Sequence, residues 1–143
     1  MRIALVCTFF MVGTVCGAQK PTGEFAGYAG WWLRNTSAEA FVIAEPYPRV
    51  TAFRLVGDEN PLHVSHDYEY FGIRTWFLEP TQNALSPLPA LQKASAESMA
   101  NGGLRLLAAP ADSADLQLCM EISLHETEPV LHIRHRSEEH TSE

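Results

Sequence analysis

Apolar and polar residues alternate along much of the chain, which is the pattern of β-strands that bury one face. The longest alternation covers residues 115–124 and places five apolar side chains on one face: Leu116, Leu118, Met120, Ile122 and Leu124. Shorter strand candidates occur at residues 31–34, 50–56, 62–64, 73–78, 104–109 and 130–135, and residues 41–44 are a short, wholly apolar strand candidate with β-branched residues. Turn-forming residues separate these segments, and residues 125–129 are typical of a hairpin connection. The chain is therefore predicted to be all-β, with its strands in an antiparallel sandwich or barrel.

Two segments depart from this pattern. Residues 19–30 are rich in glycine and are predicted to be a linker or leading loop. Three prolines mark a loop at residues 80–89, and residues 90–101 are rich in helix-forming residues before Gly102 and Gly103. We therefore expect one short helix or loop insertion near residues 88–101.

The N-terminus has the order of features found in a secretory signal. Arg2 precedes an uncharged apolar run over residues 3–15, and residues 16–18 supply the small side chains of a cleavage site before Gln19. The run is shorter than the roughly 20 residues of a membrane span. We expect residues 1–18 to be a signal peptide of an exported protein, periplasmic or extracellular, with no stable membrane insertion after cleavage. The alternatives are a buried N-terminal strand or helix, lipidation at Cys16, and a retained signal anchor.

Composition and charge restrict the class of protein. Apolar residues make up 46% of the 143-residue chain and charged residues 19%, which is typical of a globular domain. The formal net charge of −7 argues against a nucleic-acid-binding protein, which needs a basic face for the phosphates. Removal of residues 1–18 leaves Cys119 as the one cysteine, so we predict no intrachain disulfide and a buried thiol rather than a nucleophile.

The last eight residues, 136–143 (RSEEHTSE), match the in-frame translation of a common sequencing-adapter string. We interpret them as an adapter-derived artefact that replaces native sequence after His135. The alternative is a natural, solvated acidic tail.

Five short motifs resemble, in their order along the chain, those of the galactose-mutarotase-like (aldose-epimerase-like) β-supersandwich proteins. They are residues 32–35 (WLRN), residues 42–46 followed by Arg49 and Val50, residues 60–62 (NPL), residues 72–76 (GIRTW) with Pro80 and Gln82, and residues 121–124 (EISL) with residues 131–135 (LHIRH). Within that superfamily the chain most resembles an uncharacterised bacterial branch. The resemblance implies a truncated mutarotase-like β-sandwich domain over residues 31–135, a partial supersandwich, because the family fold is longer than this chain.

Four residues in the middle of the chain are candidates for binding a sugar: Arg74, Trp76, Glu79 and Gln82. A tryptophan ring offers an apolar platform to the face of a pyranose. Arginine, glutamate and glutamine offer planar hydrogen-bonding groups to its hydroxyls. The alternative is that Trp76 belongs to the core and that Arg74 and Glu79 form a surface pair.

His66 and His132 are the next ligand-binding candidates, with simple solvation as the alternative for each. Each belongs to an HxxH spacing, His63 with His66 and His132 with His135. Residues three apart on a strand point to opposite faces, so this spacing does not favour chelation. We therefore predict no metal site and no cofactor. Asn35, Thr36 and Ser37 fit an N-glycosylation sequon, a pattern that is common by chance.

The resemblance implies a carbohydrate-interacting domain, and the N-terminal signal predicts that it is exported. Mutarotation needs a general acid and a general base on opposite sides of the anomeric centre, and the family's glutamate comes from the half of the fold not present here. Catalytic residues therefore stay unassigned, and an aldose 1-epimerase-like activity would require the full-length gene to supply the pair. The alternative is a non-catalytic structural or protein-interaction β-sandwich of the cell envelope. A Glu and a His aimed into one cleft would favour the enzyme.

The interpretation of the C-terminal octet can be tested by re-reading the source DNA across the codon of His135, with primers on both sides. We expect the frame to continue past His135 into further β-rich sequence. A genomic octet followed by a stop codon would contradict this interpretation, and the small interaction sandwich would become the leading hypothesis.

Overall fold

The computed structural model describes residues 18–66, 71–73, 77–79, 84–86, 93–108 and 116–139. In this part of the chain every regular element is a strand, so the all-β prediction is confirmed. The strands are β1 (Gly23–Phe25), β2 (Tyr28–Arg34), β3 (Ala38–Ile43), β4 (Arg49–Leu55), β5 (Phe77–Glu79), β6 (Ala84–Ser86), β7 (Ala94–Ser98), β8 (Leu104–Ala108), β9 (Leu116–Leu124) and β10 (Leu131–Glu139). The described residues form no helix that could span a membrane.

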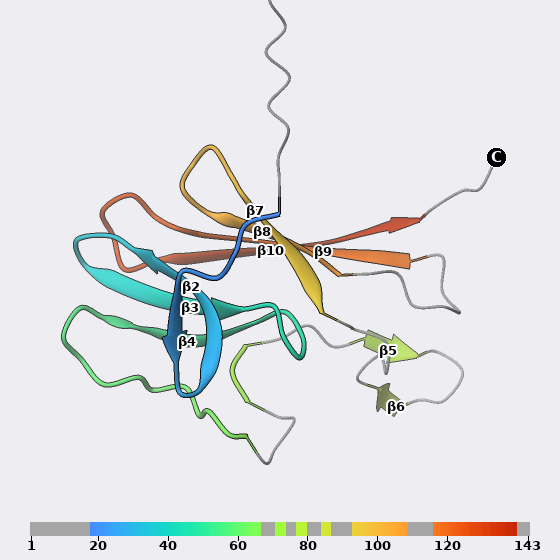
Figure 1. Ribbon diagram of the computed structural model, residues 1–143, viewed down its shortest axis with the longest axis horizontal. Coiled ribbons are helices and arrows are strands. Elements are labelled where there is room, and N and C mark those ends of the chain that lie inside the picture. The colour runs from blue at the N-terminus through green and yellow to red at the C-terminus, as the bar shows by residue number, and fades with distance from the viewer. Residues whose placement is uncertain are drawn as a thin grey trace, which may run out of the picture.

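The strands form two four-stranded antiparallel sheets and one two-stranded sheet. The N-terminal sheet has the order β1-β2-β3-β4, the C-terminal sheet has the order β10-β9-β8-β7, and β5 pairs with β6. Figure 1 shows the C-terminal sheet above β2, β3 and β4, with β5 and β6 to one side. The chain is therefore the predicted antiparallel β-sandwich.

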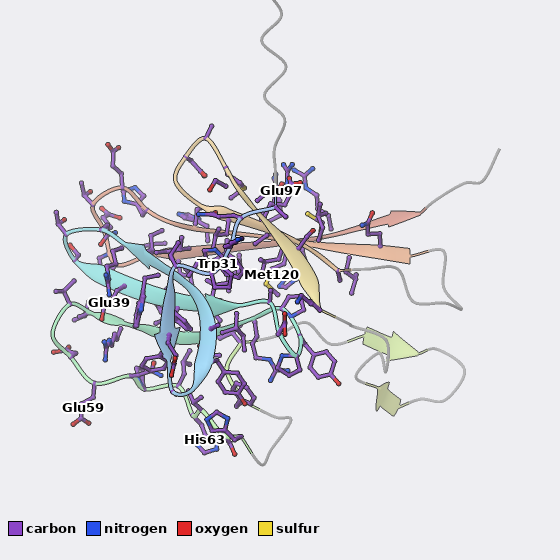
Figure 2. All side chains as sticks on the ribbon, in the orientation of Figure 1. Trp31, Glu39, Glu59, His63, Glu97 and Met120 are labelled. Carbon is purple, nitrogen blue, oxygen red and sulfur yellow. The ribbon has the colours of Figure 1, made fainter. Side chains whose placement is uncertain are left out.

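The core lies between the two sheets. Trp31 of β2 and Val42 of β3 belong to one buried cluster with Leu106 of β8 and Ile122 of β9, and each of these side chains is at most 4% exposed. Figure 2 shows Trp31 and Met120 in this interior. Because each sheet buries one apolar face against the other, this cluster supplies the main hydrophobic stabilisation of the sandwich.

The alternation predicted for residues 115–124 is confirmed by β9. Met120 and Ile122 are buried in the core, and Leu118 and Leu124 pack against it. Cys119 points to the opposite face and is nevertheless only 5% exposed, so the prediction of a buried thiol holds. The hairpin expected at residues 125–129 is also present, closed by the hydrogen bond from His125 N to Val130 O (2.8 Å).

The N-terminal sheet is covered on its outer face as well, which explains why β3 reads as a continuous apolar run. Phe41 and Ile43 point away from the inter-sheet core and form a second buried cluster with Ala52 and Phe71. Arg49 is wholly buried beside this layer, where it donates a hydrogen bond to Phe71 O (3.2 Å) and lies 4.3 Å from the centre of the Phe71 ring.

The strand predicted at residues 62–64 is wrong, because a side chain holds this segment against β4 instead. Asn60 donates hydrogen bonds to Thr51 O (2.9 Å) and Leu62 O (3.1 Å), and its Oδ1 accepts from Phe53 N (3.3 Å). The strand predicted at residues 73–78 is partly realised: Ile73 makes an isolated antiparallel bridge to Val50, and β5 begins at Phe77.

The linker or leading loop predicted at residues 19–30 is restricted to residues 19–22, because β1, a tight turn and the start of β2 occupy residues 23–30. Ala26 and Gly27 have positive φ angles of 51° and 79°, as a two-residue hairpin turn requires. At Gly30 a Cβ atom would lie 2.2 Å from Val42 O, so the close approach of β2 to β3 requires glycine. The glycines therefore serve a hairpin rather than a linker.

Of the helix or loop insertion expected near residues 88–101, residues 88–92 lie outside the described residues. Residues 94–98 form no helix: they are strand β7, which pairs with β8 over its whole length. Ala94 and Ala96 are buried and Ser95 is exposed, so the burial alternates with a period of two. Intrinsic helix propensity is a weak preference, and burial of these alanines against the core outweighs it. Gly102 and Gly103 belong to the turn between β7 and β8, where Met99 N donates to Gly103 O (2.8 Å).

Asn35, in the turn between β2 and β3, ties the two sheets together. Its Nδ2 donates to His125 O (2.6 Å) and Glu128 O (2.8 Å) in the β9–β10 hairpin, while its Oδ1 accepts from Ser37 N (2.8 Å) and Ala38 N (2.7 Å). Both amide hydrogens are thus committed to carbonyl groups of the other sheet. A glycan on Asn35 would replace one of these hydrogens, so the sequon is incompatible with this contact.

We expect Asn35→Ala to lower the free energy of unfolding by about 2 kcal/mol. The substitution removes the side-chain amide whose hydrogen bonds to His125 O and Glu128 O join the two sheets. Urea denaturation followed by tryptophan fluorescence measures the loss. The matched control is Asn101→Ala, which removes a bond within its own turn, to Gly103 N (3.1 Å). A loss for Asn35→Ala no larger than that of the control would contradict the role in joining the sheets.

Candidate functional site

The cluster predicted in the middle of the chain lies largely outside the described residues. This is so for Arg74, Trp76 and Gln82. Glu79 ends β5, where the backbone alone is described. The proposed sugar-facing role of these four residues therefore stays a prediction.

His66 lies on the outer side of the N-terminal sheet. Its ring stacks on the Tyr28 ring, with centroids 4.6 Å apart and planes 12° apart. The Tyr28 hydroxyl donates to Ser65 O (3.0 Å), and a Cβ on Gly27 would lie 2.8 Å from the His66 ring. These contacts hold Ser65 and His66 against the β1–β2 turn and give His66 a packing role.

His132 lies on the other side of the molecule. It is exposed on β10 and pairs in register with Ser123, on the face of β9 that points away from the core. The sandwich thus separates His132 from His66, and the two candidates do not share a site. His135 pairs with Met120 on the inner face, so His132 and His135 point to opposite faces. Partial burial lowers the pKa of His135, which borders a small hollow with Pro48 and Leu106.

Residues of β2 and β7 line an open cleft between the two sheets. Its volume is about 960 Å³. Its apolar lining includes Tyr28, Trp31, Ala44, Pro46, Ala94, Ala96, Leu107 and Ala108. Its polar lining includes Gln19, Lys20, Glu45, Lys93, Ser95 and Gln117. The cleft therefore combines an apolar floor with hydrogen-bonding groups, as small-molecule sites commonly do.

An ion pair between Lys93 and Glu45 stands at the mouth of this cleft, with the two side chains 73% and 59% exposed. Such an exposed pair contributes little to stability, so either group can exchange its partner for a ligand. Of the described residues that line the cleft, Glu45 is the one carboxylate, and none is a histidine. This lining offers binding groups, and it does not bring a Glu and a His together.

Residues 18–21 form one wall of the cleft, and the segment 18–22 connects the two sheets. Gln19 N donates to Ala96 O on β7 (2.7 Å), and Thr22 N donates to Gly30 O on β2 (2.9 Å). The Trp31 indole donates to Lys20 O (2.9 Å). Sequence reasoning missed this wall because residues 18–22 contribute backbone atoms to all of these contacts, and backbone atoms leave no pattern in the side chains.

A row of alternating charges crosses the outer face of the C-terminal sheet. Glu97, Arg105, Glu121 and Arg134 stand opposite one another on the four strands. Arg105 bonds Glu121 at 2.9 Å, and this hydrogen bond holds the pKa of Glu121 below its usual value and raises that of Arg105. Arg136 lies 3.6 Å from the same carboxylate. This row stabilises cross-strand pairing. Glu121 and Arg134 also line an open hollow on this face, together with Ser123 and His132.

The N-terminal sheet has a comparable ion-pair cluster around Glu39, which bonds Arg34 (3.1 Å) and Arg54 (2.6 Å). Burial opposes ionisation of Glu39, but the hydrogen bonds from Arg54 and Arg34 outweigh it and lower its pKa. The arginines also lie over the Trp32 ring, at 4.8 Å and 5.6 Å from its centre. They cover the ring that would otherwise be an aromatic platform on this face.

Comparison of the chain with protein-family models, with curated proteins and with solved structures finds no match. The resemblance to galactose-mutarotase-like proteins therefore remains a prediction that rests on the short motifs quoted above. Among the described residues no group of three potential metal ligands occurs.

The lowered pKa of Glu121 predicts a pH dependence of stability. The carboxylate is more acidic in the folded state than in the unfolded one, where its pKa is near 4.5. Its contribution is therefore present above pH 4.5 and is lost as the pH falls below that value. We expect Glu121→Gln to melt at a lower temperature than the wild type at pH 7, with the difference shrinking under acid.

Thermal melts of both proteins between neutral and acidic pH measure this difference. The control is Glu126→Gln in the exposed β9–β10 turn, which should leave the melting profile unchanged. A constant difference between Glu121→Gln and wild type at all pH values would show that the charge of Glu121 is not what matters.

Proposed function

We propose that this protein is an exported carbohydrate-binding β-sandwich that holds its ligand in the cleft between β2 and β7. The observation that carries the proposal is the composition of the cleft, whose apolar floor meets amide, carboxylate and ammonium groups at the mouth. A sugar has both characters, since its ring carries apolar C–H faces and a periphery of hydroxyls. Glu45 accepts hydrogen bonds from hydroxyls, and Lys93 and Ser95 donate to them.

The motif resemblance supports the same ligand class, because it implies an aldose-epimerase-like ancestry. The proposal concerns binding and assigns no turnover to the chain. Epimerisation needs an acid and a base around one anomeric centre, and the described lining offers Glu45, already paired with Lys93. An acid–base pair would have to come from other parts of the gene.

One observation favours the alternative, a structural or protein-interaction sandwich of the cell envelope. The edge of β7 is covered by Gln19, and the edge of β4 is covered by Asn60 and Ile73. Within the described part of the chain, β10 pairs with β9 alone, so its second edge presents backbone donors and acceptors. Residues 131–135 of β10, which precede the C-terminal octet, form an open edge that accepts a further strand from a partner.

A panel of hexoses and uronic acids separates these two functions. If the cleft binds sugar, at least one member of the panel should change the fluorescence of Trp31 in the cleft wall and raise the melting temperature. Glu45→Gln should weaken that sugar's affinity about tenfold, because an amide replaces the charged acceptor.

The matched control is Glu59→Gln, the same chemical change in an exposed turn after β4, away from the cleft (Figure 2). It should leave the affinity unchanged. If no sugar in the panel alters fluorescence or melting, the carbohydrate proposal fails and the interaction sandwich takes its place.

A further inference from the structure

Gln19 is held against β7 by two contacts that involve both of its polar ends. Its backbone N–H donates to Ala96 O (2.7 Å), and its side-chain Oε1 accepts from the Ser98 hydroxyl (2.6 Å). Ala96 and Ser98 are two residues apart on one strand, so the backbone nitrogen and the carboxamide of Gln19 turn toward the same short stretch of β7. Gln19 is also the residue that follows the expected signal cleavage site.

We infer that Gln19 is a modification site, at which the exported chain becomes blocked by an N-terminal pyroglutamate. This inference rests on the proposed export, because cleavage after Ala18 is what frees the α-amine. The free amine nitrogen attacks the side-chain Cδ carbonyl, a new N–Cδ bond closes a five-membered lactam, and the side-chain nitrogen leaves as ammonia with the transferred proton. The step is intramolecular and consumes no other reactant.

The product retains both contacts to β7. A lactam keeps one N–H and one carbonyl oxygen, which are the two groups that Gln19 already directs at Ala96 O and the Ser98 hydroxyl. An uncyclised N-terminus would be an ammonium with three donors and a positive charge, beside Lys20 and in the same cleft wall as Lys93. Cyclisation removes this positive charge. It also leaves one N–H for the one acceptor, Ala96 O, so the lactam fits the edge of β7 better than the ammonium does.

The experiment uses the full chain, expressed with its own N-terminus in a secreting bacterial host. Mass spectrometry of the N-terminal peptide identifies both its first residue and any mass loss. We expect a peptide that begins at residue 19 and is lighter by one ammonia, and a chain resistant to stepwise N-terminal degradation. The control Gln19→Glu keeps the acceptor but has water as its leaving group, so it should remain uncyclised over the same period.

A second variant tests the docking of the lactam. Ser98→Ala should leave cyclisation intact and lower the melting temperature of the blocked protein by roughly 2–4 °C, because it removes the donor to the ring carbonyl.

The outcomes are distinct. A peptide that begins at residue 19 and retains its ammonia overturns cyclisation and leaves export standing. A peptide that begins at any other residue overturns the cleavage site, and the modification with it. A cyclised protein whose melting is unaffected by Ser98→Ala overturns the docking on β7.

Discussion

The packing of β2 and β3 against β8 and β9 is the interaction on which the rest of the structure depends. Large side chains such as Trp31, Leu106 and Ile122 fill the centre of the sandwich. Toward β7 the lining changes to alanines, at residues 44, 94, 96 and 108, which are too small to fill the space between the sheets. The cleft is therefore a direct result of where the large side chains stop, and residues 18–21 close one side of it.

The N-terminal sheet is stabilised from both of its faces, and this sets it apart from the C-terminal sheet. Phe41 and Ile43 are buried under an outer layer, whereas the outer face of β7–β10 has the row of charges through Arg105 and Glu121. Two asparagines complete the arrangement: Asn60 holds the outer segment to β4, and Asn35 joins the hairpin ends of the two sheets. The asparagine side chains thus hold in place loops that have too few apolar side chains to pack firmly against the sheets.

Strand existence could be predicted from the sequence wherever one face is buried, as in β9, because burial imposes a period of two on the side chains. The prediction failed where backbone geometry decides the structure. Glycines at positions 27 and 30 resemble those of a linker, yet one supplies a positive φ and the other a close strand contact. Residues 94–98 resemble a helix because alanine favours helices, and only packing reveals the strand. The cleft could not be predicted, because its walls come from residues far apart in the chain and partly from backbone atoms.

The connectivity of the two sheets has a consequence for how the chain folds. Each strand pairs with its immediate neighbours in sequence, so β1–β4 and β7–β10 are separate meanders built from short loop closures. Such local pairing costs little chain entropy and favours rapid formation of each sheet. The contacts of high sequence separation, such as that of Asn35 with Glu128, arise only when the two sheets meet. Docking of the two meanders is therefore the step that closes the longest loops of the described chain.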